Sequence, residues 1–328
     1  MEVVTELSEQ PPPATGSAVT IGAYDGVHLG HRTVLADLRR RAADAGLATV
    51  VVTFDRHPSS VVRPEQAPKL LCDLDQKLEL LAEVGVDRTV VVHFDEARSS
   101  ETAEEFVLGT LVDALATRLV VVGEDFHFGH GRKGNVELLA EMGRVYGFTV
   151  DGVHLASDTP SGPPISSTRI RGLVAEGAVE EAARLLGRPH SVRGVVAAGD
   201  GRGGSELGFP TANLTVPAEL ALPSLGIYAC WYERPSGERY QAAVSVGRRP
   251  TFYGDGGTLL VEAHLLDFSG DLYGEHGRLS FVRRLRDELA FPSVDDLVAQ
   301  MHRDVAAARA ALGDAPPSPA VPFAGPRC

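Results

Sequence analysis

The chain has 328 residues, a formal net charge of −13 at pH 7, 44% hydrophobic residues and 23% charged residues; this is an ordinary globular composition, with enough length for two domains. The acidic balance argues against nucleic acid as a partner, and no apolar run is long enough to span a membrane. The three cysteines are scattered and odd in number, which argues against a disulfide framework or a zinc site and favours a reducing cytoplasm.

Residues 1–16 are polar and end in consecutive prolines, so we expect a disordered leader there. From 17 to 187, short β-branched runs alternate with helix-like stretches, which have N-cap candidates at Asp73 and at Ser100, the latter with Glu104. This alternation predicts an α/β fold with a doubly wound parallel sheet, in which ligands bind beyond the carboxyl ends of the strands. The expected strands are 18–21, 49–53, 89–92, 119–122 and 149–153, and the expected helices are about 30–45, 73–84, 101–117 and 134–145.

The sequence pattern changes at about residue 188. Gly, Pro and Asp turns now separate the apolar runs, which favours an antiparallel β-barrel domain over a second parallel sheet. A final amphipathic helix is expected over 293–312, so the second domain would span 188–312, and the proline-rich residues 313–328 are expected to form a disordered tail. The expected strands of the barrel are 191–197, 226–233, 240–246, 258–266 and 278–283.

The first expected strand ends in a glycine-bearing turn that leads into a helix carrying His28 and His31. Two imidazoles three residues apart share one face of the first helical turn, beside backbone N–H groups and the positive end of the helix dipole. With Gly22, Asp25 and Gly30 in the same turn, this arrangement suits the phosphates of a nucleotide. It is also compatible with a metal site, although the His-Glu-x-x-His pattern of zinc hydrolases is missing, and with a pair of surface histidines that has no role.

Hydroxyl and arginine side chains follow the fifth expected strand at the start of a helix. Ser166, Ser167 and Thr168 come first, and Arg169 and Arg171 follow. One hydroxyl would serve as an N-cap, and the full set favours a phosphate clamp at the same sheet edge as the histidines. No serine elbow or cysteine nucleophile occurs in these loops, so the residues favour direct phosphoryl or nucleotidyl transfer.

A second group of polar residues lies in the expected barrel. The glycine-rich stretch 199–208 is either a flexible turn or a phosphate loop. Thr211 and Asn213 follow in alternation, and their hydroxyl and amide oxygens are ligands suited to Mg²⁺ shared with nucleotide phosphates. Further along, Glu262 shares a strand face with His264 and is either a surface carboxylate or a base for a substrate hydroxyl.

Several of these segments resemble a known enzyme family. His28–His31 and Ile165–Arg171 are similar to the paired signatures of the nucleotidyltransferase superfamily. The longer strings 22–31, 53–58 and 123–129 resemble the bacterial bifunctional riboflavin kinase/FMN adenylyltransferases, also called FAD synthetases. Gly208–Asn213 is similar to the most specific segment of that family's kinase module, so the resemblance reaches from the first site to the second.

The resemblance implies a transferase that phosphorylates riboflavin to FMN with ATP and then transfers an adenylyl group from ATP to FMN, giving FAD and pyrophosphate. The implied partners are these flavins and ATP with Mg²⁺, and neither nucleic acid nor a membrane; no oligomeric state is indicated. His28, His31 and Arg171 would act in adenylyl transfer, Glu262 would activate the riboflavin hydroxyl, and Thr211 and Asn213 would bind Mg²⁺. Implied ATP contacts are Gly22, Asp25, Gly30, Ser166, Ser167, Thr168, Arg169, Gly199, Gly201, Arg202 and Gly208, and implied flavin contacts are Asp55, His57, Asp125, Phe126, Phe128, Arg249, Asp267 and Phe268.

Two departures from the family pattern bear on whether both activities are retained. Ala23-Tyr24 stands where the family usually has Asn-Phe, and 203–206 replaces part of the kinase loop, with an extra residue and without its second arginine. If Arg202 does not substitute for that arginine, only one activity would be retained. The chain could also be a catalytically inactive flavin-binding regulator. An adenylyltransferase for another nucleotide or for pantetheine phosphate would not explain the Phe-Pro-Thr-Ala-Asn segment.

Overall fold

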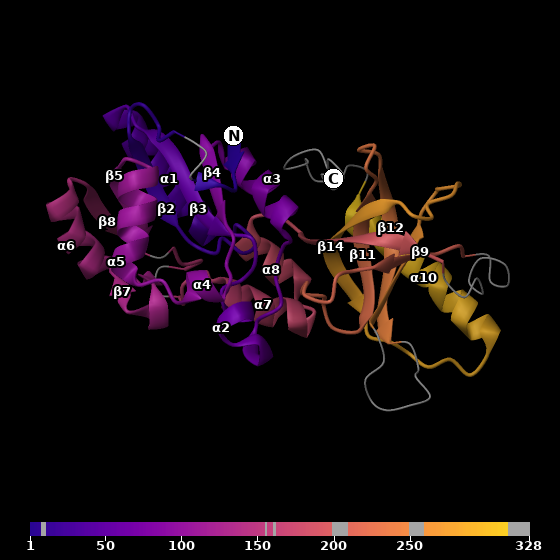
Figure 1. The fold of residues 1–328 in the computed structure, drawn as a ribbon. Coiled ribbons are helices and arrows are strands. Elements are labelled where there is room, and N and C mark those ends of the chain that lie inside the picture. The colour runs from indigo at the N-terminus through magenta and orange to yellow at the C-terminus, as the bar shows by residue number, and fades with distance from the viewer. Residues whose placement is uncertain (8–10, 155, 160–161, 199–208, 249–258, 314–328) are drawn as a thin grey trace. The chain divides into compact units, whose positions relative to one another are not determined.

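The computed structural model describes residues 1–7, 11–154, 156–159, 162–198, 209–248 and 259–313. The chain divides into two compact units (Figure 1). The first unit consists of Met1–Pro68 and Asp73–Ser166, and the second consists of Lys69–Cys72 and the chain from Ser167 onward. No helix in these described ranges combines the length and the apolar character needed to cross a membrane.

A six-stranded parallel sheet forms the centre of the first unit, in the order β1-β4-β3-β2-β5-β8. Its central strands are rich in valine and threonine and are buried along nearly their full length, as a sheet covered on both faces requires. The five strands expected from the sequence are confirmed. The strands are β1 (Glu2–Val4), β2 (Ser17–Ile21), β3 (Ala48–Phe54), β4 (Arg88–Val92), β5 (Thr117–Gly123) and β8 (Thr149–Val153).

Helices cover both faces of this sheet, so successive residues of a strand enter different hydrophobic clusters. In β2, Ala18 packs in one cluster with Leu38 of α1, whereas Val19 packs in the other with Leu111 of η3 and Leu139 of α6. The helical elements are α1 (Leu29–Ala45), α2 (Ser59–Val62), η2 (Pro64–Gln66), α3 (Leu74–Val84), α4 (Glu96–Ser99), α5 (Ala103–Phe106), the π-helix η3 (Val107–Ala114), η4 (His130–Arg132) and α6 (Val136–Tyr146), and β6 (His127–Phe128) pairs with β7 (Gly134–Asn135).

Two local features of the first unit differ from the expectation. Glu2–Val4 lies in the expected disordered leader but forms β1 and pairs in parallel with β4; a three-residue edge strand is too short to show a hydrophobic pattern. The helix expected from residue 101 is capped by Thr102 and not by Ser100, because Thr102 and Glu105 form a reciprocal capping box. Asp73 is the N-cap of α3, as predicted.

A closed antiparallel barrel forms the centre of the second unit, with strands in the order β10-β13-β12-β11-β14-β9. The side chains of Tyr228, Val244 and Phe281 lie fully buried in its core. The five barrel strands expected from the sequence are confirmed, and β10 is an additional strand of four residues. The strands are β9 (His190–Ala197), β10 (Ala212–Thr215), β11 (Gly226–Glu233), β12 (Arg239–Arg248), β13 (Leu259–Leu265) and β14 (His276–Arg286).

Helix α10 (Val294–Leu312) packs on the outside of this barrel over β11, β12 and β14 (Figure 1). Its N-cap is Ser293, the residue where the sequence places the start of the helix. Ala308 and Leu312 of the helix pack in one cluster with Trp231 of β11. The fold class predicted from the sequence, a parallel α/β sheet followed by an antiparallel barrel and a C-terminal helix, is confirmed.

Two further helices, α7 (Ser167–Glu176) and α8 (Val179–Leu186), belong to the second unit, where α8 packs on β14 and β9. The compact units therefore divide after Ser166. The domain boundary expected at 187/188 follows the change in sequence pattern and stays a prediction. The expected tail lies, apart from Gly313, outside the described residues.

Candidate active sites

The first candidate site is the turn between β2 and α1. His28 is the N-cap of α1, and its Nδ1 accepts a hydrogen bond from the backbone N–H of His31 at 3.2 Å. Because Nδ1 accepts, the neutral imidazole carries its proton on Nε2, which is thus a hydrogen-bond donor. The start of α1 also supplies backbone N–H groups and the positive end of the helix dipole. The turn therefore offers several donors of the kind that bind an anionic group.

The two histidine rings are held in a stack. The ring centroids of His28 and His31 are 3.6 Å apart at an interplanar angle of 16°. The ring of Tyr24 lies on the His31 side, with centroids 4.9 Å apart, and its hydroxyl is 2.6 Å from the Thr20 hydroxyl in β2. Burial raises the pKa of Tyr24, so this hydroxyl keeps its proton and its hydrogen bond. The stack is therefore anchored to the central strand of the sheet.

The two predicted glycines of this turn pack closely against the rings of His28 and Tyr24. A Cβ on Gly30 would lie 3.0 Å from the carbonyl oxygen of Ile165 and 3.1 Å from the His28 ring, so a side chain there would displace the imidazole. A Cβ on Gly22 would lie 3.1 Å from the Tyr24 ring. Asp25, also predicted for this site, is buried with an exposed fraction of 3%. The structure thus brings together the predicted residues at 22–31.

Asp55, predicted to contact flavin, lies after β3 and is held by several donors. Its carboxylate accepts from the backbone N–H of Phe94 at 3.0 Å, contacts Nδ1 of His93 at 2.8 Å and pairs with Arg56 at 3.0 Å. Burial acts to raise the pKa of this carboxyl, but the hydrogen bonds outweigh it and the pKa lies below its ordinary value. The other predicted residue here, His57, accepts the Ser59 N–H at 3.2 Å.

The predicted flavin residues after β5 lie in two environments. Phe126 and Phe128 stack with centroids 5.4 Å apart, and Phe128 also contacts Phe106, which belongs to the core of the first unit. Asp125 is exposed, and its carbonyl oxygen lies 2.8 Å from Nδ1 of His127. Phe128 is therefore a core residue as well as a candidate ligand contact, and the flavin roles of these residues stay predictions.

The predicted phosphate clamp falls at the division between the units. Ser166 ends the first unit, and Ser167, Thr168, Arg169 and Arg171 lie in the first turn and a half of α7. The hydroxyls and guanidiniums do share the start of one helix, as the sequence predicts. Their role beside the histidines stays a prediction.

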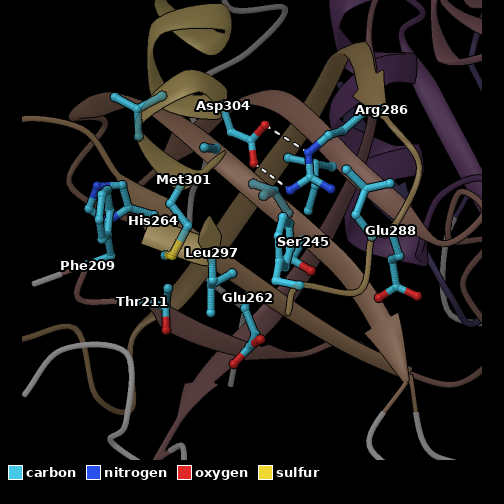
Figure 2. A pocket seen from close by; sticks show the side chains of 16 residues that line it. Phe209, Thr211, Ser245, Glu262, His264, Arg286, Glu288, Leu297, Met301 and Asp304 are labelled. Atoms are coloured by element: carbon cyan, nitrogen blue, oxygen red, sulfur yellow. Dashed lines mark hydrogen bonds and ion pairs between the residues drawn. The ribbon is translucent and has the colours of Figure 1, made fainter. Parts of the chain in front are cut away.

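The second candidate site is a pocket of about 370 Å³ between the barrel wall and α10 (Figure 2). Thr211 and Glu262 both line it. In the strand register Asn213 lies opposite Glu262 on one side, and Ser245 lies opposite Glu262 on the other. Side chains in one such row point to the same face of a sheet, so the carboxylate lies between an amide and a hydroxyl on neighbouring strands.

His264 holds the Thr211 segment against the barrel. Its Nδ1 lies 2.8 Å from the carbonyl oxygen of Pro210; since a carbonyl oxygen can only accept, this nitrogen carries the proton. The ring of Phe209 lies edge-on to His264 and to His302 of α10, with centroids 5.1 and 5.0 Å apart. These contacts fix the polypeptide immediately before Thr211.

The opposite side of the pocket is mainly apolar, with Glu288 and Asp304 as its charged members. It is formed by α10 and by the segment between β14 and α10, which bring together side chains separated from Glu262 by 27 to 43 residues. The pocket therefore has a polar side with a carboxylate and hydroxyls and an apolar side with aliphatic, thioether and aromatic groups. The apolar lining from these two elements is Leu289, Phe291, Leu297, Met301 and Val305.

Two residues predicted to contact flavin make other contacts in the structure. Asp267 forms two hydrogen bonds with Arg309 of α10, each 2.7 Å long, and Phe268 packs edge-on against Tyr240 with centroids 4.9 Å apart. Neither is among the residues that line the described pocket. The predicted residues Gly199, Gly201, Arg202, Gly208 and Arg249, and the altered segment 203–206, lie outside the described residues.

Sequence reasoning missed Ser245, Arg286 and Asp304, which line the pocket. The outward position of Ser245 could have been found from the alternation of β12, where Val244 and Val246 are buried. No sequence pattern indicates the ion pair between Arg286 and Asp304, because it joins the end of a strand to a separate helix. Among the described residues, no group of three or more His, Cys, Asp or Glu could hold a metal ion.

Comparisons with known proteins match both halves of the chain. A family model described as FAD synthetase matches residues 10–169, and one described as riboflavin kinase matches residues 186–312. A bifunctional riboflavin kinase/FMN adenylyltransferase from Haemophilus influenzae is 36% identical, with 94% of this chain and 99% of that protein covered. The chain belongs to the family of bifunctional riboflavin kinase/FMN adenylyltransferases.

Two further relatives carry the same family description, and a solved structure with a different name matches most of the chain. The protein of the same description from Pseudomonas fluorescens is 38% identical over 94% of this chain and 97% of its own length. That from Listeria monocytogenes is 39% identical, with coverages of 87% and 89%. A crystal structure named macrolide-efflux protein, from Streptococcus pneumoniae, matches with a TM-score of 0.81 and 32% identity over 94% of this chain and 98% of that chain. The predicted family and its two transferase activities are confirmed.

Proposed function

We propose that the barrel pocket is where this bifunctional enzyme phosphorylates riboflavin. The pocket pairs an apolar side with a polar side, and riboflavin has the same division between its aromatic ring system and its hydroxylated tail. With the rings against Leu297 and Met301, the tail would reach Glu262. The cross-strand row of Asn213, Glu262 and Ser245 is the single observation that carries this assignment.

Glu262 is the proposed general base. Its carboxylate would accept the proton of the terminal hydroxyl of the tail as that oxygen forms a bond to the γ-phosphorus of ATP; the bond from this phosphorus to the bridging oxygen breaks, and ADP leaves. Asn213 and Ser245, on the strands that flank β13, would orient the carboxylate or the hydroxyl. This chemistry needs positioning and charge neutralisation but no protein nucleophile.

The residues present fit a magnesium ion at the polar side of the pocket. Thr211 and Asn213 offer a hydroxyl and an amide oxygen beside the Glu262 carboxylate, and such hard oxygen donors suit Mg²⁺. Thr211 and Asn213 would hold the ion, which would neutralise the charge of the nucleotide phosphates. The contacts of His264 with Pro210 and Phe209 would keep the Thr211 segment in place.

The turn before α1 is the proposed ATP site for adenylyl transfer. His28 and His31, with the N–H groups of α1, would bind the phosphates. An oxygen of the FMN phosphate would attack the α-phosphorus, and pyrophosphate would leave with charge stabilisation from Ser166, Thr168 and Arg171. In the described part of the chain the buried cysteines Cys72 and Cys230 form no disulfide, which fits the reducing cytoplasm that we propose as the location of the enzyme.

Incubation of the purified protein with riboflavin, ATP and Mg²⁺, followed by chromatographic separation of the flavins, tests both assignments. Formation of FAD from riboflavin supports two working sites. FMN alone would contradict the proposed adenylyl-transfer site. No product from riboflavin, with FAD formed when FMN is supplied, would contradict the kinase assignment and would show that only adenylyl transfer is retained.

A further inference from the structure

Arg286, the last residue of β14, joins this strand to α10 by a bidentate ion pair (Figure 2). Its Nε donates to Oδ1 of Asp304 at 2.9 Å and its Nη2 donates to Oδ2 at 2.6 Å. Asp304 is buried, with an exposed fraction of 7%, and also accepts from Nε2 of Gln300 at 2.8 Å. A fork-to-fork pair of this kind fixes both the distance and the relative rotation of the two elements.

The same guanidinium also contacts the segment 287–293 that connects β14 to α10. Its Nη1 donates to the carbonyl oxygen of Asp287 at 2.8 Å, and its central carbon lies 5.9 Å from the ring centroid of Phe291. One side chain therefore contacts the strand end, the connecting segment and the helix. The planar guanidinium can do this because its donors point in fixed and different directions.

These contacts lie at the apolar side of the pocket. Leu289 and Phe291 come from the connecting segment, and Leu297 and Met301 come from α10. The base and the proposed metal ligands come from β13 and from the stretch at β10, whereas the guanidinium donates its hydrogen bonds to Asp304 and Asp287. The hydrogen bonds of Arg286 therefore go to the elements that would receive the flavin rings, and not to those that carry the base and the proposed metal ligands.

We propose that Arg286, acting through Asp304, is a positioning residue that sets the affinity of the kinase site for riboflavin. This inference rests on the assignment of the barrel pocket to riboflavin. A flat ring system gains most of its binding energy when both walls contact it. Displacement of the connecting segment and α10 from the barrel wall therefore lowers riboflavin affinity. Glu262 stays on β13, and the Thr211 segment keeps its hydrogen bond between Pro210 and His264 when the contact of Phe209 with α10 is weakened, so turnover at saturation is preserved.

The test compares Arg286→Lys and Asp304→Asn with the wild-type enzyme. Lysine keeps the charge but loses the bidentate geometry and the planar contact with Phe291, and asparagine keeps the shape of Asp304 but loses its charge. We expect the KM for riboflavin and the Kd measured by quenching of flavin fluorescence without ATP to rise by roughly tenfold, by analogy with the loss of a charge-assisted hydrogen bond. The kcat for FMN formation should change by less than about threefold.

Arg239→Lys is the matched control. Arg239 pairs with Glu233 at 2.7 Å, and the side-chain exposed fractions of 15% and 7% resemble those of 18% and 9% for Arg286 and Asp304. This pair joins two barrel strands away from the pocket lining. We expect Arg239→Lys to leave the riboflavin KM within about twofold of the wild-type value, although it also replaces the guanidinium of a buried ion pair by an ammonium group.

Two results would overturn the proposal. One is an unchanged riboflavin KM and Kd in both Asp304→Asn and Arg286→Lys, or in whichever of them folds. The other is an equal rise in KM in Arg239→Lys, which would show a general loss of barrel stability. A separate measurement tests the assignment of the pocket itself. If Glu262→Gln retained full kinase turnover, that assignment would fail, whatever the KM values of the Arg286 variants.

Discussion

The imidazoles of His28 and His31 lie face to face, 3.6 Å apart, while Nδ1 of His28 accepts the backbone N–H of His31. One side chain therefore caps the helix, and the same interaction directs its Nε2 proton away from the cap. The structural and the proposed chemical role of His28 use different nitrogens, so substitutions can separate them.

We predict that His28→Asn remains folded but loses adenylyl transfer. Asparagine is among the best N-cap residues, so the helix start keeps its partner, whereas the Nε2 donor is lost and the rate should fall by roughly 10²–10³-fold. His28→Ala should lose the same activity and, in addition, about 1 kcal/mol of stability. FAD formation from FMN and thermal unfolding of both variants provide the measurements. Equal activity of His28→Asn and wild type would remove the histidine from the mechanism.

Tyr24→Phe tests the anchor of the ring stack. The variant leaves the buried Thr20 hydroxyl without the contact that it makes at 2.6 Å, so the free energy of unfolding should fall by about 1–2 kcal/mol. Phenylalanine keeps the aromatic ring, so the contact with the His31 ring is retained. Replacing Thr20 by valine in the same chain should recover part of the loss. Chemical denaturation followed by circular dichroism compares the two single variants with the double variant, and additive losses would contradict a direct coupling.

Glu262→Gln should abolish riboflavin phosphorylation. The amide keeps the shape of the side chain but cannot accept a proton, and loss of a general base lowers kcat by roughly 10²–10⁴-fold. FAD formation from supplied FMN should be unaffected, because His28 and Glu262 lie in different units. The measurement is therefore the ratio of the two activities in one preparation, and a parallel loss of both would indicate misfolding.

Asp55 gives a prediction of pH dependence. The pKa of its folded-state carboxyl lies below the ordinary value, because hydrogen bonds from Phe94, Arg56 and His93 outweigh the effect of burial. The carboxylate therefore contributes stability above its unfolded-state pKa of about 3.9, and this contribution is lost as the pH falls through the folded-state value. The difference in Tm between wild type and Asp55→Asn should be largest near pH 7 and should shrink below about pH 4. A difference that grows with acidity would show the opposite sign of linkage.

The sequence was sufficient for most of the fold because its main signals are local. Val-rich runs identified the parallel strands, and Ser293 and Asp73 marked helix starts. The sequence was insufficient where contacts between distant or competing residues determine whether an element forms and where it begins. The strand Glu2–Val4 depends on pairing with β4, and the helix cap moved from Ser100 to Thr102 because Glu105 completes a capping box there.

The candidate sites show the same limit. Glu262 and Thr211 could be identified from motifs and alternation, but the register that places Ser245 beside Glu262 is a property of strand pairing. Asp267 was predicted to contact flavin because it matches a family segment. In the structure it instead forms an ion pair with Arg309. Contacts between a strand end and a distant helix, such as that of Arg286 with Asp304, leave no periodic trace in a single sequence.

The apolar side of the proposed kinase pocket comes from the last helix of the described chain and the segment before it, whereas the histidine turn and its sheet are complete by Ser166. During translation the ribosome therefore synthesises the histidine turn, its sheet and then α7, with Thr168 and Arg171, before it makes the barrel strands. With riboflavin in the proposed pocket, its binding would require residues 294–312 to have been synthesised and packed on the barrel. The ribosome thus finishes the proposed adenylyl-transfer residues first and the proposed kinase pocket last. A flavin would pass through the two sites in the reverse order, because riboflavin is phosphorylated before FMN receives the adenylyl group.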